Sequence, residues 1–183
     1  MHVLGALLGV LILAGSFFFG TFNSMKNAEI NVAAAQGQVE NQMQRRADLI
    51  PNLVETVKGY AAFEKETITA VSNARAKLAG AKDITTMDAA NQELSGALGR
   101  LLAIAENYPD LKANQQFTEL MRELSGSENR IAVARRDYNE AVRTYNSKVE
   151  TFPGRFFAGM FGFSPKPQFA ADESAKVVPQ VKF

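Results

Sequence analysis

One run of residues without a charge constrains this chain more than any other feature. The segment from Val3 to Phe22 reads VLGALLGVLILAGSFFFGTF and holds no Asp, Glu, Lys or Arg. A helix of about 20 residues rises about 30 Å, which is the thickness of the hydrocarbon core of a bilayer. The run therefore predicts an N-terminal transmembrane anchor over residues 1–22.

A cleaved signal peptide is the competing interpretation of this run, because Ala14-Gly15-Ser16 offers small residues of the kind that signal peptidase accepts. Two observations favour the anchor. The segment before the apolar run is only Met1 and His2, and phenylalanines continue the run past the supposed cleavage point. Lys26 is the first cation after the run, so the positive-inside rule indicates a cytoplasmic soluble region behind a single span.

Small residues recur along the predicted anchor. On an ideal helix four of them fall within about 60° of one another. Such a face lets two membrane helices approach closely, although glycine is also common in membrane helices without that role. The alternatives are a self-association face and ordinary composition, and the residues concerned are Gly5, Gly9, Ser16 and Gly20.

Charge and cysteine content exclude several classes of protein. The 20 Lys and Arg residues nearly balance the 19 Asp and Glu residues, which leaves a formal charge of +1. A nucleic-acid partner is therefore not expected, because such proteins carry an excess of positive charge that neutralises phosphates. The chain has no Cys, so disulfides and thiol chemistry are excluded.

After Asn23 the sequence has helical periodicity almost throughout. We expect a first helix over Lys26–Ala47 and a second from Asp48, with Pro51 in its first turn, to Gly80; one helix kinked at Pro51 is the alternative. A third begins at a Thr85 or Thr86 cap and ends before Pro109. The fourth follows a heptad-like seam from Phe117 to Phe152 that includes Tyr138 and Tyr145, and Pro153 ends it.

Four amphipathic helices with short connections predict an all-α fold, with an antiparallel up-and-down four-helix bundle behind the transmembrane helix. The predicted organisation is an anchor (1–22), a bundle (23–152) and a Phe-rich element with an extended tail (153–183). In this topology the end of the fourth helix returns to the membrane. For the last three residues, Val181-Lys182-Phe183, packing against the bundle and capture by a peptide-binding domain are both open.

The segment after the fourth helix gathers phenylalanines in a short stretch with Arg155 as its only charge. Because the seam ends at Pro153, part of this stretch is expected to lie outside the core. It would form a short amphipathic element in the membrane interface, or in a groove of a neighbouring subunit at that level. Its residues are Arg155, Phe156, Phe157, Met160, Phe161 and Phe163.

Four stretches carry a resemblance to a known family. They read RRADLIPNLVETVKGY (45–60), LGRLLAIAENYPDLKAN (98–114), ENRIAVARRDYNEAVRTYN (128–146) and TFPGRFFAGMFGF (151–163). Together they resemble the LemA family of bacterial membrane proteins, to which the magnetosome protein MamQ is related. The resemblance implies a four-helix bundle behind one membrane helix, in the bacterial inner membrane. It does not imply a particular activity.

The residues needed for common catalytic and metal sites are missing. The only His is His2, so neither a di-iron centre with its Glu-x-x-His pairs nor a nucleophile activated by a histidine can be built in the soluble region. We expect no catalytic residue, no cofactor and no metal. The charged run that contains Arg130, Arg135, Arg136 and Arg143 is interpreted as a solvated helix face, with an acidic or lipid partner as the alternative.

Three functions fit these observations. The first is a non-enzymatic scaffold that self-associates on membrane lipid and organises or shapes the bacterial membrane. The second is an adaptor that presents its bundle to another membrane protein, such as a protease or a transporter. The third is a sensor that holds a small ligand between its helices.

Overall fold

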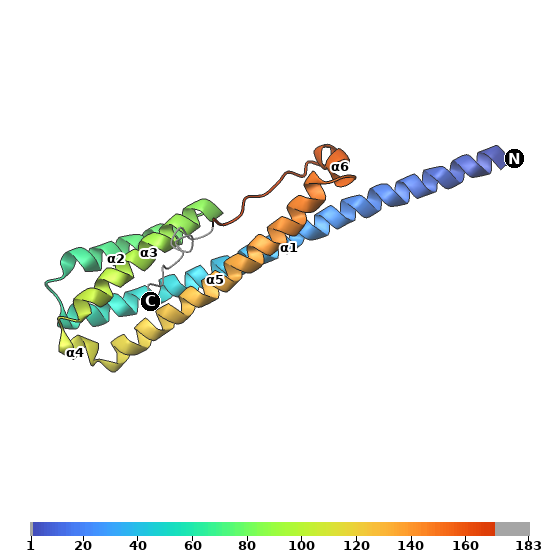
Figure 1. Ribbon diagram of the computed structural model, residues 1–183. Coiled ribbons are helices and arrows are strands. Elements are labelled where there is room, and N and C mark those ends of the chain that lie inside the picture. Colours follow the sequence, from blue (N-terminus) through green and yellow to red (C-terminus); the bar gives the residue numbers. More distant parts are fainter. Residues whose placement is uncertain (1, 171–183) are drawn as a thin grey trace, which may run out of the picture. The chain divides into compact units, whose positions relative to one another are not determined.

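The computed structural model describes residues 2–170, and the described part of the chain is all helical. Its helices are α1 (His2–Tyr60), α2 (Lys65–Gly80), α3 (Ile84–Ala105), α4 (Pro109–Lys112), α5 (Gln115–Glu150) and α6 (Gly154–Phe161), as Figure 1 shows. The all-α prediction is confirmed. Predictions that concern the tail from residue 171 onward lie outside the described residues.

α1 is one continuous helix through the predicted anchor, through Asn23 and through Pro51. The expected new helix at Asp48 is therefore wrong, and the alternative of one helix running through Pro51 is the observed one. The physical reason is an apolar stripe whose phase does not change at the proline. It consists of Val39, Met43, Ala47, Ile50, Leu53 and Val57, all buried. Burial of these side chains outweighs the hydrogen bond that proline removes.

The chain turns at Ala61–Glu64, where no break was predicted. Ala61 still donates to the carbonyl of Val57 over 2.8 Å, and Glu64 donates to the carbonyl of Ala61 over 3.1 Å. Neither Gly nor Pro occupies the turn itself, which explains why the sequence pattern missed it.

α3 begins two or three residues earlier than expected. Asp83 is its N-cap, and its carboxylate accepts a hydrogen bond from the Thr86 amide over 2.9 Å. Thr86 occupies the third helical position and its hydroxyl accepts from the Asp83 amide. Thr86 therefore completes a capping box and is not itself the cap.

The described chain divides into two compact units. The first consists of the residues up to Arg46 together with Glu123–Pro167, which is the N-terminal part of α1, most of α5, and α6. The second consists of Ala47–Arg122 together with the residues from Gln168. α1 and α5 contribute to both units. In the second unit α2 and α3 pack side by side, with Val71, Ala74, Leu94 and Leu101 buried.

Candidate functional site

The predicted anchor is the apolar part of α1. Among the described residues, this is the one helix long and apolar enough to cross a membrane, by length and composition, and none of its most apolar window is buried. The exposed side chains include Leu8, Leu11, Leu13 and Phe19. An exposed apolar surface of this extent is typical of a helix whose surroundings are lipid.

α6 packs against the last turns of this apolar helix. The ring of Phe161 lies 4.8 Å from that of Phe18 and 5.0 Å from that of Phe22, and the ring of Phe157 lies 5.7 Å from that of Phe18. These edge-on contacts have the geometry that aromatic pairs prefer. We name the six rings that meet here the phenylalanine cluster: Phe17, Phe18, Phe22, Phe157, Phe161 and Phe163.

The predicted interfacial residues therefore separate into two faces of α6. Phe157 and Phe161 face α1 within the phenylalanine cluster, whereas Phe156 is 71% exposed and Met160 is 64% exposed. Phe152 was expected to close the α5 seam, and this is wrong because its side chain is 89% exposed. Val149 is buried in its place. We name Phe156 and Met160 the exposed α6 face; Phe152 lies in the connection before α6.

Gly154 makes the approach of α6 to α5 and α1 possible. A Cβ at this position would collide with the main-chain carbonyl of Lys148 and would lie 2.6 Å from the terminal methyl of Met25. Only glycine fits between these groups. By contrast, a Cβ at Gly159, in the same helix, would meet open space.

The segment after α6, residues 163–167, is held along α5; we name it the strap. Asn146 donates to the carbonyl of Lys166 over 2.9 Å and accepts from the Lys166 amide over 2.8 Å. The Tyr138 hydroxyl donates to the carbonyl of Pro167 over 3.1 Å. Asn146 therefore links α5 to the strap. Burial raises the pKa of Tyr138, so this phenol remains a donor at neutral pH.

Lys166 also reaches α1 through its side chain. Its ammonium lies 3.3 Å from the Glu29 carboxylate and 5.4 Å from the centre of the Tyr145 ring. Lys26, hydrogen-bonded to the same carboxylate over 2.8 Å, holds the pKa of Glu29 below its usual value, and Lys166 adds to that effect. The strap is therefore attached to both long helices of the first unit.

Arg46, the last residue of the first unit on α1, is only 2% exposed. Its guanidinium forms an ion pair with the Glu128 carboxylate on α5 at 2.5 Å. Burial lowers the pKa of Arg46, and the negative charge of Glu128 opposes that shift. Since a buried cation that loses its partner is costly, this pair fixes how α1 meets α5.

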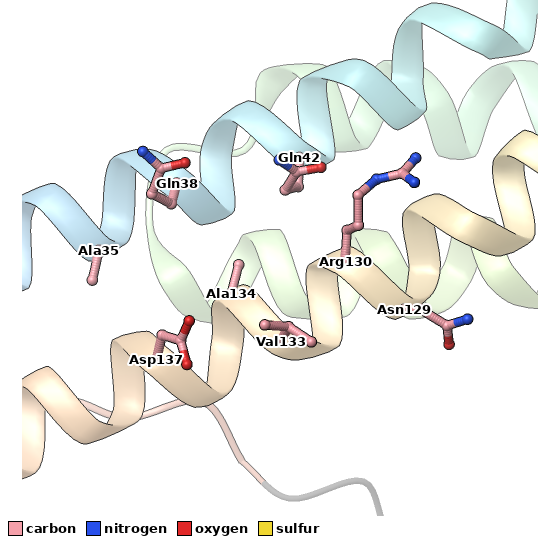
Figure 2. A pocket seen from close by; sticks show the side chains of 8 residues that line it. All are labelled: Ala35, Gln38, Gln42, Asn129, Arg130, Val133, Ala134 and Asp137. Atoms are coloured by element: carbon pink, nitrogen blue, oxygen red, sulfur yellow. The ribbon is translucent and has the colours of Figure 1, made fainter.

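A groove of about 420 Å³ lies between α1 and α5 in the first unit, and we name it the amide groove. Figure 2 shows its lining, with Gln38 and Gln42 from α1 and Arg130 and Asp137 from α5. The side-chain carbonyl oxygen of Gln42 is buried and accepts no hydrogen bond from the described residues.

Arg130, from the predicted charged face, folds back towards Gly126. Two other charges of that face, Arg136 and Arg143, form exposed pairs with Asp137 and Glu140.

The small residues of the anchor point mostly away from α6. On an ideal helix their common direction lies about 150° from that of Phe18 and Phe22. A Cβ at Gly5 or Gly9 would meet open space, and Ser16 is exposed. Gly20 differs from the other three small residues because it lines a hollow next to α6. Within the described chain, no group of His, Cys, Asp and Glu could hold a metal ion.

Contacts join the first of the four stretches quoted for the family resemblance to the second and to the third. Tyr60 accepts a hydrogen bond from Asn114 over 3.0 Å, which joins the first stretch to the second. Arg46 and Glu128 join the first to the third, and the fourth contains α6. The model of the LemA family matches residues 35–183. The chain belongs to the LemA family.

Named relatives agree with this assignment. Magnetosome protein MamQ 2 of Paramagnetospirillum magneticum is 26% identical over 96% of this chain and 77% of its own length. MamQ of Magnetospirillum gryphiswaldense is 26% identical over 96% and 76%. Protein LemA of Metamycoplasma hominis is 27% identical over 78% of this chain and 67% of its own length. Family membership supports a membrane-associated helical protein.

Proposed function

We propose that this LemA-family protein is a non-enzymatic membrane scaffold, anchored by α1 and fixed on the bilayer by α6. The observation that carries the proposal is the packing of Phe157 and Phe161 on the end of the apolar run of α1, with the exposed α6 face directed elsewhere. Each exposed Phe that enters the interface contributes about 1.5 to 3 kcal/mol. α6 would thereby set the tilt of α1 on the membrane.

The proposal includes self-association through the anchor. Gly5, Gly9 and Ser16 present a face that this chain leaves uncovered, and close helix approach in lipid depends on such small residues. The name of the magnetosome relatives gives a setting in which a membrane is shaped. The location is the bacterial inner membrane, in a single pass, with the soluble region in the cytoplasm, where the positive charge of Lys26 favours it.

The depth of the exposed α6 face tests the interfacial role. Because the chain contains no Trp, Phe156→Trp introduces a single indole. In the full-length protein reconstituted with brominated phospholipids, this indole should be strongly quenched. Phe63→Trp is the matched control, since Phe63 is 93% exposed in the turn after α1. Equal quenching of both indoles would refute the interfacial role.

Particle size tests self-association. The detergent-extracted protein should form particles larger than one chain, and Gly9→Ile with Ser16→Ile should reduce them. An unchanged particle would remove the small-residue face from the proposal. A monomer that co-purifies with a defined membrane protein would instead favour the adaptor function.

A ligand sensor is the second candidate, and the amide groove favours it. The buried carbonyl oxygen of Gln42 lacks a donor among the described groups, and a ligand N–H could supply one. The volume is in the range of small-molecule sites. A thermal-shift screen with the intact protein and Gln42→Leu tests this function: stabilisation that disappears in the variant supports it.

A further inference from the structure

A second hollow, of about 380 Å³, lies where α1 leaves its uncharged run. One wall comes from α1 and contains Phe17, Gly20 and Ser24. The other comes from the end of α5, with Lys148, and from the α5–α6 connection, with Phe152. Met25, which is buried, lies in the lining between them. Both walls belong to the first unit.

The chemical character of the hollow changes along α1. Phe17 and Gly20 belong to the run that the bilayer would surround, whereas Ser24 follows that run. From Phe17 to Ser24 the helix rises about 10 Å. A phospholipid has the same order of groups, with an apolar chain inside the bilayer and a phosphate at its surface.

The polar end of the hollow carries a cation that lacks an anionic partner. The Lys148 ammonium donates to the hydroxyl of Ser24 over 2.7 Å, and no carboxylate of the described chain pairs with it. The ammonium also donates to the main-chain carbonyl of Ser24 over 3.5 Å, so one of its three N–H donors remains for a ligand. Lys148 and Ser24 are 124 residues apart in sequence, and the fold brings them together at this level.

The hydroxyls of the hollow are not equivalent. Thr21 donates to the carbonyl of Phe17 over 2.9 Å, and Thr151 donates to the carbonyl of Ser147 over 2.6 Å. Their protons are therefore engaged within their own helices. Ser24 accepts from Lys148 and keeps its own proton for an acceptor. Donors for an anion are thus the Lys148 ammonium and the Ser24 hydroxyl.

We propose that this hollow binds one anionic phospholipid, with its phosphate on Lys148 and Ser24 and an acyl chain along Phe17 and Gly20. The inference rests on the proposed position of α6 at the membrane surface. Charge complementarity selects an anionic headgroup, because a phosphocholine headgroup adds a cation beside Lys148. The apolar end distinguishes a lipid from free phosphate, which would leave Phe17 and Gly20 uncovered.

Native mass spectrometry of the full-length protein in detergent tests the proposal. Titrated with phosphatidylglycerol, each chain should retain one lipid, and Lys148→Gln should weaken this binding about tenfold or more, as expected for the loss of a hydrogen bond to a charged group. Lys148→Arg should restore binding. The surface variant Lys82→Gln is the matched control and should bind as the parent does. Phosphatidylcholine should bind more weakly, and equimolar inorganic phosphate should not displace phosphatidylglycerol.

Three outcomes would overturn the lipid site: no retained lipid, equal binding by Lys148→Gln and the parent, or displacement by inorganic phosphate. Each can be told apart from failure of the proposed function. In each case quenching of Trp at position 156 by brominated lipid reports separately whether α6 lies in the interface. A quenched indole together with no lipid bound at Lys148 would reject only the proposed lipid site and not the interfacial position of α6.

Discussion

The two compact units hold their helices together by different means. In the second unit the contacts are largely those of neighbours in sequence: α2 and α3 form a hairpin, the Asp83 capping box starts α3, and Lys77 pairs with Glu93 across the hairpin. In the first unit the phenylalanine cluster, the pair of the strap's Lys166 with Glu29, and the contact of Lys148 with Ser24 join segments that are far apart in the chain. The predicted anchor, α6 and the hollow beside Lys148 also lie in this unit. The segments proposed to contact the membrane are therefore the ones held by long-range packing.

The largest expected effect comes from the Arg46–Glu128 pair. Glu128→Ala leaves a buried guanidinium without its carboxylate, and we expect a loss of about 2 to 3 kcal/mol, less than for a fully buried pair because the Glu128 side chain is 46% exposed. Hydrogen exchange should accelerate in residues 24–46 and 123–150 more than in α2 and α3.

A double replacement, Arg46→Met with Glu128→Met, is the control for this experiment. It removes the charge together with its partner, so it should be more stable than Glu128→Ala alone. Equal acceleration in both units would show that they do not differ in the way proposed.

Gly154→Ala should have the next largest effect. The added methyl group collides with the Lys148 carbonyl and Met25, and overpacking of this kind costs about 1 to 3 kcal/mol. α6 should separate from α1, and trypsin should cleave faster after Arg155. Gly159→Ala, in the same helix but facing open space, should leave cleavage unchanged. If both variants behave alike, close packing at Gly154 is not what holds α6.

The all-α class and much of the core could be predicted from the sequence, because apolar residues at helical spacing report directly on burial. Phe117, Tyr138 and Tyr145 of the predicted seam are buried as expected. Phe152 was assigned to the same seam and is exposed, since periodicity gives a face but not where that face ends. The prediction at Pro51 was wrong for a related reason. The rule that proline ends a helix considers only neighbouring residues, whereas burial of the α1 side chains on both sides of Pro51 depends on tertiary structure.

The candidate sites could be predicted only in part. The Phe-rich composition of residues 151–163 indicated an apolar element, but composition could not say that Phe157 packs on α1 while Phe156 stays exposed. Lys148 gave no signal, because its contact with Ser24 depends on tertiary structure. The strap was missed for the same reason, because the hydrogen bonds of Asn146 to Lys166 form only in the folded chain.

Release of the strap should have a smaller effect than either change above. Asn146→Ala removes two hydrogen bonds to the main chain of Lys166, and we expect a loss of about 1 to 2 kcal/mol. Faster hydrogen exchange should be confined to residues 163–167 and the facing part of α5. Asn73→Ala, at an exposed position in α2, is the matched control and should change neither the stability nor the hydrogen exchange of these segments. Exchange that spreads through α1 would mean that the strap supports the whole first unit.

The smallest expected effect concerns the second unit and depends on pH. The Thr86 amide and hydroxyl hold the pKa of the Asp83 carboxyl below its usual value, because both donate to the ionised form. The stabilisation is therefore fully present above the ordinary pKa of an aspartate, about 3.9, and is lost as pH falls through the lower folded-state value. Thermal melts of the parent and Asp83→Asn should differ slightly at pH 7 and converge in acid, since asparagine still caps a helix but carries no charge. Asp83→Ala should melt lower than Asp83→Asn at every pH, because it removes the acceptor itself. A difference between parent and Asp83→Asn that persists in strong acid would show that the carboxylate's charge contributes nothing to the start of α3.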